Sequence, residues 1–275
     1  MRVAIYQGPE FAQDVKANLD TLAIQAKQAA AQGARLLIAS EMFVTGYNIG
    51  PDSIAELAEP AEGASALRIA DIAASSDIAV LYGYPQREGD TIFNAAQLIE
   101  RDGSRLANYR KTHLFGDIDR STFAPGDTES AIVKVDEWRI GILICYDVEF
   151  PENVRRLALA GADFVAIPTA LMKPYEFVPR IMLPTRAFEN GLFVAYANHC
   201  GTEGELEYCG LSCLVGPDGV DLARADKHEA LVVAELDRGL LDEWRQLNTY
   251  LPDRRPALYR ALCDNADNLS TGINL

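Results

Sequence analysis

The feature that most constrains the fold is a regular alternation of short apolar runs, rich in β-branched residues, with longer amphipathic stretches. Continuous apolar runs are typical of strands buried on both faces, and the stretches between them are typical of helical crossovers. The 275 residues are 49% hydrophobic and contain no low-complexity linker or fixed repeat, so we expect one α/β domain. The strand candidates are residues 2–7, 36–39, 78–82, 140–144, 164–167 and 193–197.

Three amphipathic stretches carry helix start and stop signals. Apolar side chains recur at three- and four-residue steps in the first, and Pro151 opens the second at a position where its missing N–H costs little. Turn residues between paired strand-like runs also predict two hairpins, one between residues 92 and 107 and one between residues 131 and 144. Hairpins in an α/β domain predict mixed sheets. The expected helices are residues 14–32, 151–160 and 179–190, each followed by glycine at Gly33, Gly161 and Gly191.

Polar residues follow three of the strand candidates. In layered α/β proteins, chemistry collects beyond the carboxyl ends of the strands, so these residues are the first candidates for a site on one rim. They are Glu41 after run 36–39, Cys145 after run 140–144 and Asn198 after run 193–197.

Cys145 is the strongest local signal. It lies between a buried strand and the helix that begins at Pro151, where backbone N–H groups and a helix end favour a thiolate. The alternative is a buried structural cysteine, since free cysteine often serves as a small apolar core residue.

A thiol nucleophile needs a base, and imidazole is the usual one. The chain offers only His113, His199 and His228, and nothing in the sequence ties any of them to Cys145. Glu41 is a better candidate, because burial at a strand end raises the pKa of a carboxyl toward neutrality. A salt-bridge role is the alternative for Glu41.

Lys111 is a candidate for the positive charge that stabilises the reacting groups. It follows the hairpin turn at residues 101–103, and a lysine fixed near Cys145 favours the thiolate and stabilises an oxyanion. Taken alone, an exposed lysine is the simpler interpretation.

The segments around these residues resemble the signature regions of the nitrilase superfamily of carbon–nitrogen hydrolases. Four pieces stand in the family's order across most of the chain, and that order is more specific than any single piece. They are residues 41–47 (EMFVTGY), 109–114 (YRKTHL), 145–152 (CYDVEFPE) and the structural helix at 186–190 (RAFEN).

The resemblance implies a role for each residue. Glu41 is the general base, Lys111 the electrostatic stabiliser, Cys145 the nucleophile, and the backbone N–H of Tyr146 a second oxyanion donor. The implied reaction cleaves a small carboxamide through a cysteine thioester and releases ammonia and a carboxylic acid, with no metal or organic cofactor.

The resemblance also implies the architecture. We expect a four-layer αββα sandwich with two mixed β-sheets, a single domain over residues 1–275, that dimerises by stacking its helices. The segment from about residue 248 is expected to be an extension that packs on a partner subunit.

One residue departs from the family pattern. Many members carry a second glutamate after the lysine, and eight residues beyond Lys111 this chain has Asp119. Asp119 either orients Lys111 or the substrate, or belongs to a solvated acidic loop. The pair Tyr146–Asp147 stands where family nitrilases tend to have Trp-Glu, which favours amides over nitriles. Further pocket candidates are Tyr47, Phe115, Leu171 and Asn198.

Other functions stay open at the level of sequence. N-carbamoyl amide or nitrile hydrolysis uses the same triad, an acyltransferase uses the same thioester, and the aspartate at 119 fits a scaffold or binding protein that has lost turnover. A zinc site is a further alternative, although its spacing matches no compact finger. Its ligands are His199, Cys200, Cys209 and Cys213.

Charge and targeting signals narrow the partners and the compartment. The net charge of −15 argues against a general affinity for nucleic acid or an anionic membrane. The five cysteines form no CxxC pair, and the N-terminus lacks the long apolar region of a signal peptide. No run approaches the roughly 18–20 apolar residues of a membrane span. We therefore expect a cytoplasmic enzyme whose partners are a small amide and a second copy of itself.

Overall fold

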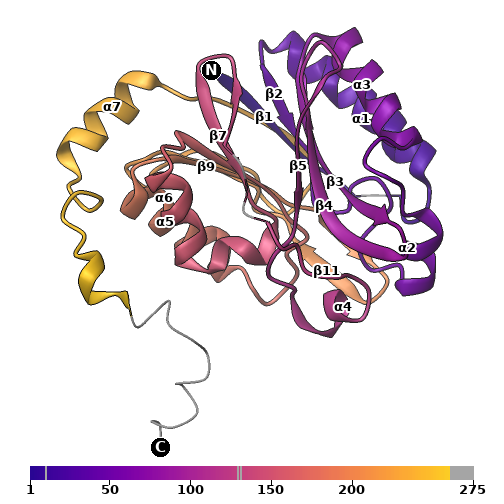
Figure 1. The fold of residues 1–275 in the computed structure, drawn as a ribbon. Coiled ribbons are helices and arrows are strands. Elements are labelled where there is room, and N and C mark those ends of the chain that lie inside the picture. Colours follow the sequence, from indigo (N-terminus) through magenta and orange to yellow (C-terminus); the bar gives the residue numbers. More distant parts are fainter. Residues whose placement is uncertain (10, 129, 131, 261–275) are drawn as a thin grey trace, which may run out of the picture.

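Two six-stranded sheets pack face to face, and helices cover their outer sides (Figure 1). The computed structural model describes residues 1–260 except 10, 129 and 131. Helices α1 and α3 cover one sheet, and α5 and α6 cover the other. This arrangement confirms the predicted four-layer αββα sandwich and its single domain.

The first sheet has the order β14-β1-β2-β3-β4-β5. Strands β1, β2 and β3 run parallel, whereas β4, β5 and β14 each run antiparallel to their neighbours. The predicted hairpin between residues 92 and 107 is β4–β5, so the sheet is mixed as expected. The bounds are β1 (Arg2–Gln7), β2 (Leu36–Ile38), β3 (Ala79–Glu88), β4 (Thr91–Ile99), β5 (Arg105–Arg110) and β14 (Ala230–Glu235).

The second sheet has the order β13-β12-β9-β8-β7-β6. Strands β7, β8 and β9 are parallel, and the predicted second hairpin is β6–β7. A separate hairpin, β10–β11, was not predicted. The bounds are β6 (Val133–Val135), β7 (Trp138–Ile142), β8 (Phe164–Pro168), β9 (Phe193–Ala197), β10 (Cys200–Glu203), β11 (Leu206–Cys209), β12 (Cys213–Val215) and β13 (Asp221–Arg224).

The helices follow their local signals closely. Helix α1 (Val15–Ala31) is capped by the carboxylate of Asp14, which accepts a hydrogen bond from the Ala17 N–H at 2.9 Å. The predicted third helix is divided, because a π-helical turn, η2, precedes α6. The remaining bounds are α2 (Pro51–Leu57), α3 (Ala64–Ser76), α4 (Gly116–Arg120), η1 (Cys145–Glu149), α5 (Pro151–Leu159), η2 (Val178–Met182), α6 (Leu183–Asn190), α7 (Arg238–Leu247) and η3 (Pro256–Leu258).

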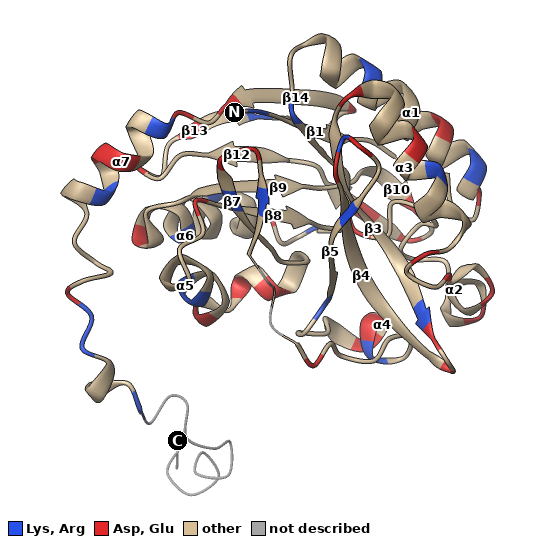
Figure 2. Ribbon diagram, turned by 45° about the horizontal axis from the view of Figure 1, so that its top comes forward, with Lys and Arg blue, Asp and Glu red and all other residues tan. Residues whose placement is uncertain are grey.

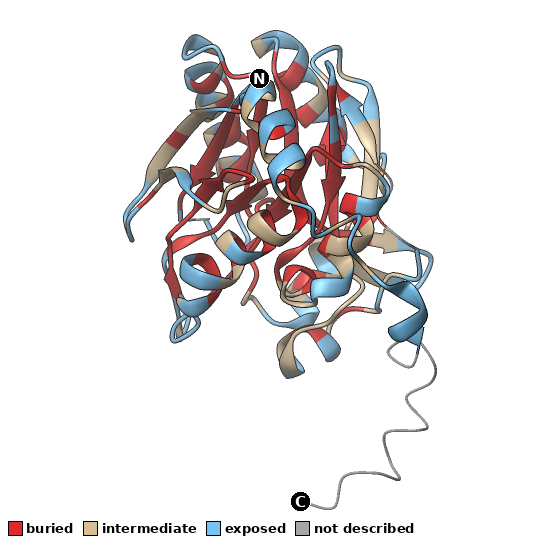
Figure 3. Cartoon of the chain, turned by 90° about the vertical axis from the view of Figure 1, so that its left-hand side faces the viewer, coloured by how far each residue is buried: buried red, intermediate tan, exposed pale blue. Residues whose placement is uncertain are grey.

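The core is built from alternate faces of the strands. In β1, Val3 and Ile5 point toward the second sheet, whereas Ala4 and Tyr6 join the cluster under α1 and α3. This period of two is what a sheet between a helix layer and another sheet requires. The strands are buried while the outer helix faces are exposed (Figure 3), and charged residues lie mainly on helices and loops (Figure 2).

Beyond the sandwich, α7 leads into the C-terminal segment. The expectation of an extension from about residue 248 concerns residues 248–260, which the structure describes, and 261–275, which lie outside the described residues. Its packing on a partner subunit stays a prediction. Within the described part of the chain, none of the helices has the length and apolar character needed to span a bilayer.

Candidate active site

The site lies where strand ends of both sheets meet. Glu41 follows β2 and Lys111 follows β5 in the first sheet, whereas Cys145 follows β7 in the second. The Glu41 N–H donates to the carbonyl of Thr169, just after β8, at 3.4 Å and so ties the two rims together. Three distant stretches of chain therefore converge as the sequence predicted.

Lys111 bridges two carboxylates. Its Nζ donates to Glu41 Oε1 at 2.7 Å and to Asp119 Oδ2 at 2.7 Å, and all three side chains have no solvent exposure. The amide Nδ2 of Asn94, on β4, also donates to Glu41 Oε1, at 2.6 Å. Among the described residues no hydrogen bond reaches Glu41 Oε2, which leaves that oxygen able to accept a proton.

Asp119 is a buried part of this cluster. It lies on α4, where its Oδ1 accepts from the Tyr47 hydroxyl at 2.8 Å and its Oδ2 accepts from the Phe115 N–H at 2.8 Å. The alternative of a solvated acidic loop is wrong, because α4 turns the side chain inward onto Lys111. The shorter carboxylate thus still reaches the lysine.

Burial and charge set the protonation of the site. Burial raises the pKa of Glu41, Asp119 raises it further, and Lys111 opposes the rise. For Lys111, burial acts to lower the pKa, but the carboxylates of Glu41 and Asp119 outweigh it and raise the pKa well above its usual value. The lysine therefore stays charged, and Glu41 becomes a stronger base than an exposed carboxylate.

Cys145 occupies a strained turn. Its φ of 45° lies in the left-handed region, which residues with a Cβ rarely adopt, and it begins the 3₁₀ turn η1 rather than the helix α5. Burial raises the pKa of the thiol, and so does the charge of Glu41, while Lys111 and hydrogen bonds with Thr169 and Ala170 oppose the rise. The expectation that a helix end favours a resting thiolate is wrong, because η1 separates the buried sulfur from α5. The thiol is protonated until a base takes its proton.

Close backbone packing fixes Glu41. The next residue, Met42, has a φ of 53°, and Gly83 on β3 lies against both. A Cβ at Gly83 would lie 2.5 Å from Met42 N and 2.7 Å from the Glu41 Cα. Glycine is therefore required on β3 for the catalytic segment to approach it.

Asp147 joins the lysine and cysteine segments. Its Oδ1 accepts from the Thr112 hydroxyl at 2.9 Å and the His113 N–H at 2.9 Å, and its Oδ2 accepts from the Ile144 N–H at 3.1 Å. The Tyr109 hydroxyl donates to the same Oδ2 at 3.0 Å. The sequence analysis did not single out Asn94 or this role of Asp147, because both depend on partners distant in sequence.

The pocket candidates divide into two groups. Phe115 and Tyr146 meet edge to face with ring centroids 5.4 Å apart, beside the nucleophile, and Tyr47 is held by Asp119. Leu171 and Asn198 are buried, and the Asn198 side chain binds backbone groups: its Oδ1 accepts from the Leu171 N–H at 2.7 Å and its Nδ2 donates to the Leu171 carbonyl at 3.1 Å. Substrate contact by these residues stays a prediction.

Neither a histidine base nor a zinc site finds geometric support. His113 Nδ1 lies 3.0 Å from Asp147 Oδ1, and His199 Nε2 lies 2.6 Å from the Glu41 carbonyl oxygen. Cys209 Sγ donates to the Leu171 carbonyl at 3.2 Å. Among the described residues no group of three or more His, Cys, Asp or Glu side chains is arranged to hold a metal ion.

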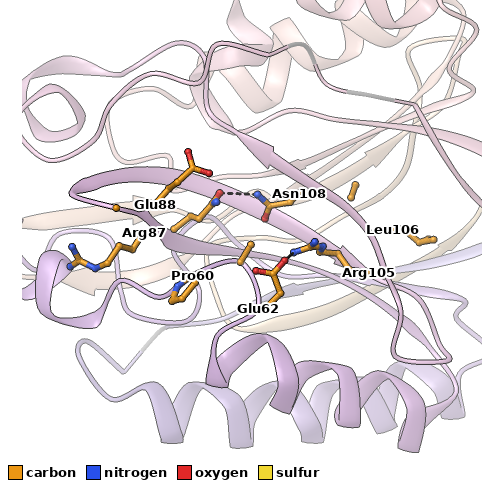
Figure 4. Close-up of a pocket in the computed structure, with 11 residues that line it drawn as sticks. Pro60, Glu62, Arg87, Glu88, Arg105, Leu106 and Asn108 are labelled. Atoms are coloured by element: carbon orange, nitrogen blue, oxygen red, sulfur yellow. Dashed lines mark hydrogen bonds and ion pairs between the residues drawn. The ribbon is translucent and has the colours of Figure 1, made fainter.

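One surface groove lies away from this chemistry. This groove, of about 610 Å³, is lined by residues of β3, of β5 and of the segment between α2 and α3, and Glu62 and Arg105 form an ion pair in it (Figure 4). A second cavity, of about 340 Å³, is next to the site, with Tyr47 on one side and Ile118 on the other. We place the chemistry at the buried cluster and not at this groove, because the two carboxylates that line the groove are paired with arginines, Glu62 with Arg105 and Glu88 with Arg110.

The fold and the site together define a hydrolase that acts through a cysteine. The sequence profile described as Carbon-nitrogen hydrolase matches residues 2–246, and the chain belongs to this family, in the amidase-like branch of the nitrilase superfamily. It is accordingly an enzyme that hydrolyses a carboxamide by way of a cysteine intermediate.

Relatives cover nearly the whole chain. A protein of Pseudomonas protegens described as "Hydrolase in pqqF 5'region" is 53% identical, over 94% of this chain and 90% of that protein. A protein of Pyrococcus abyssi described as a nitrilase is 35% identical, over 85% of this chain and 89% of that protein.

A solved structure is similar throughout. The amidase of Nesterenkonia sp. AN1, as a double mutant in complex with acrylamide, is 37% identical, with a TM-score of 0.86 over 95% of this chain and 97% of that one. Another structure of that amidase shows the acetamide moiety of fluoroacetamide added covalently at its active-site cysteine.

Proposed function

We propose that this chain is an amidase for small linear carboxamides, in which Glu41, Lys111 and Cys145 carry the reaction and Asp119 orients Lys111. The observation that supports it most is the buried Oε2 of Glu41, which has no hydrogen bond within the described part of the chain, while Lys111 donates to the other oxygen of the same carboxylate. The site thus keeps one acceptor oxygen of raised basicity beside a protonated thiol.

The acylation step follows from this arrangement. Glu41 takes the proton of the Cys145 thiol as the sulfur attacks the amide carbon, and Lys111 and the backbone N–H of Tyr146 stabilise the oxyanion. Protonated Glu41 then delivers the proton to the leaving nitrogen, the carbon–nitrogen bond breaks, and ammonia departs. A thioester remains on Cys145.

Deacylation reuses the same carboxylate. Glu41 takes a proton from water as the oxygen attacks the thioester carbon, and the carbon–sulfur bond breaks. The proton returns to the Cys145 sulfur and the carboxylic acid leaves, so that the enzyme ends in its starting state. No step requires a redox partner or a cofactor.

A substrate panel tests this function. Purified protein should release ammonia from small carboxamides, and Cys145→Ala should abolish the release while folding normally. N-carbamoyl compounds and nitriles belong in the panel, because the Pyrococcus relative is described as a nitrilase. A preparation that releases no ammonia from any of the three classes contradicts the proposal. If a nitrile is hydrolysed faster than every amide, the chain is a nitrilase and not an amidase.

We also propose a cytoplasmic homodimer. Three large apolar side chains stand exposed on the outer side of the second sheet: Leu159 (50%) on α5, Ile181 (52%) on η2 and Phe177 (62%) just before η2. A second copy stacked through its own helices would cover them. Light scattering after gel filtration should give a dimer that Phe177→Glu weakens, whereas a monomer at micromolar concentration contradicts the proposal.

A further inference from the structure

The hairpin β10–β11 packs against the catalytic segments without contributing a catalytic residue. The Cys209 N–H donates to the Leu171 carbonyl at 3.1 Å, and Met172 forms an isolated bridge with Tyr208. His199 directly precedes β10, and Glu203 is the last residue of β10. Both side chains reach toward the cluster around Lys111. Their contacts form two chains of interactions that share Tyr208, and we call them the histidine arm and the glutamate arm.

The histidine arm ends on Glu41. His199 is fully buried, and burial lowers its pKa to about 3, so the ring is neutral at working pH. Its Nε2 lies 2.6 Å from the Glu41 carbonyl oxygen, and because a carbonyl can only accept, Nε2 carries the proton and donates. The ring also stacks on Tyr208 at a centroid distance of 4.6 Å, which fixes its plane.

The glutamate arm ends on Asp119. The Glu203 carboxylate accepts from the backbone N–H of Tyr47 at 3.0 Å, from that of Asn48 at 2.7 Å and from the Tyr208 hydroxyl at 2.5 Å. The Tyr47 hydroxyl then donates to Asp119 Oδ1 at 2.8 Å. Hydrogen bonds that a carboxylate accepts are roughly twice as strong as those between neutral groups, so they hold both partners in place.

The approach of Glu203 depends on a glycine. Gly46 has a φ of +92°, and a Cβ there would lie 2.4 Å from Glu203 Oε1. The loop that follows Glu41 therefore leaves room for this carboxylate, at a position whose φ also favours glycine.

We propose that the β10–β11 hairpin is the positioning element of the active site: His199 holds the Glu41 backbone, and Glu203, through Tyr47, holds Asp119 against Lys111. The inference rests on the proposed catalytic roles of Glu41 and Lys111. His199, Glu203 and Tyr47 act in it as positioning residues. Displacing a reacting group by about 1 Å can cost about 10²-fold in rate, so the arms matter although they touch no reacting atom.

The main test compares two glutamates of the same hairpin. Glu203→Gln replaces one acceptor oxygen by a donor that faces N–H groups, and it should lower kcat about tenfold or more with a smaller change in KM. Glu207→Gln is the matched control, because Glu207 is exposed and its carboxylate pairs with the exposed Lys173. This control should leave both constants unchanged. Equal kcat values for the two variants would overturn the proposal.

Substitutions that keep an aromatic ring test each arm separately. Tyr47→Phe removes only the hydroxyl that reaches Asp119, and His199→Phe keeps a ring against Tyr208 but removes the donor to Glu41. Each should lower kcat severalfold, whereas Tyr84→Phe, which removes a buried hydroxyl bonded to Asn108, should not. These variants decide the question even if Glu203→Gln fails to fold, because unchanged kcat in both contradicts the proposal.

A double-mutant cycle tests the connection within the glutamate arm. If Glu203 acts through Tyr47, the variant carrying Glu203→Gln and Tyr47→Phe should lose little more than Glu203→Gln alone. If the two fold-losses in kcat multiply in the double variant, the residues act independently, and the proposed connection from Glu203 through Tyr47 is wrong.

The proposed function and this inference can fail separately. A wild-type protein that releases ammonia from an amide, with Glu203→Gln matching Glu207→Gln, keeps the function and rejects the hairpin's role. If the wild type hydrolyses nothing, the rate at which iodoacetamide alkylates Cys145, read by mass spectrometry, replaces kcat. The same ranking of variants then supports the positioning role, and equal rates reject it.

Discussion

Two clusters of paired carboxylates and cations in this molecule share residue types and differ in burial. At the strand ends, Lys111 lies between Glu41 and Asp119 with no exposure on any of the three. On the outer groove, Arg105 pairs with Glu62, with side-chain exposures of 40% and 69%. The comparison teaches that composition alone does not mark a site. Burial away from solvent, together with the charges buried there, is what shifts the pKa values of Glu41 and Lys111.

The physical reason is the cost of removing charges from water. A buried cation that loses its partners is strongly unfavourable, whereas an exposed pair is screened and contributes on the order of 0–1 kcal/mol. The buried cluster also holds an acceptor oxygen, Glu41 Oε2, that is shielded from solvent and has no partner among the described residues. The inner cluster therefore holds a buried carboxylate whose pKa is raised, whereas solvent reaches both side chains of the outer pair.

The largest effect is expected at the centre of the inner cluster. Lys111→Met leaves two buried carboxylates facing one another without a cation, and should lower kcat by about 10²–10³-fold. It should also lower the free energy of unfolding by about 3–5 kcal/mol. Urea unfolding and ammonia-release kinetics measure both. A variant with wild-type stability would break the comparison, because the inner charges would then behave like exposed ones.

An intermediate effect is expected from one charge within the inner cluster. The carboxylate of Asp119 raises the pKa of Glu41, and the base is lost as pH falls through that raised value. Asp119→Asn should therefore lower the pKa of Glu41 and move the acid limb of the kcat/KM profile to lower pH. Asp117→Asn, on the exposed side of the same helix, is the control and should leave the limb in place. A limb that moves to higher pH contradicts the assignment.

The smallest effect is expected in the outer groove. Arg105→Met removes the cation from an exposed pair and should change the free energy of unfolding by less than about 1 kcal/mol, with kcat unchanged. The same urea titration and kinetic assay provide the measurement. A loss comparable to that of Lys111→Met would show that the groove is a site in its own right.

Much of the architecture follows from local sequence. The periodicity and the Asp14 cap define α1, and Pro151 marks the start of α5 to the residue. Each predicted triad residue follows a strand end, as the α/β rule requires, and the family resemblance selected Glu41, Lys111 and Cys145 from among many polar residues. Where the pattern is local, sequence was sufficient.

Long-range features were missed for physical reasons. Asn94 meets Glu41 across 53 positions of sequence, and Glu203 meets Tyr47 across 156, so no spacing rule links them. Met42 and Cys145 have a left-handed φ, but neither is a glycine or an asparagine, the residue types that would predict it from sequence. The thiolate expectation failed similarly, because η1 and the depth of Cys145 depend on tertiary packing.

The central claim is that Cys145 carries the acyl group during turnover. Acid quenching of the wild-type protein while it hydrolyses a small amide, followed by peptide mass spectrometry, tests it most directly. We predict one acyl group, attached to Cys145 and removed by hydroxylamine, and neither adduct nor turnover in Cys145→Ala. An acyl group on another residue, or continued ammonia release by Cys145→Ala, would contradict the account.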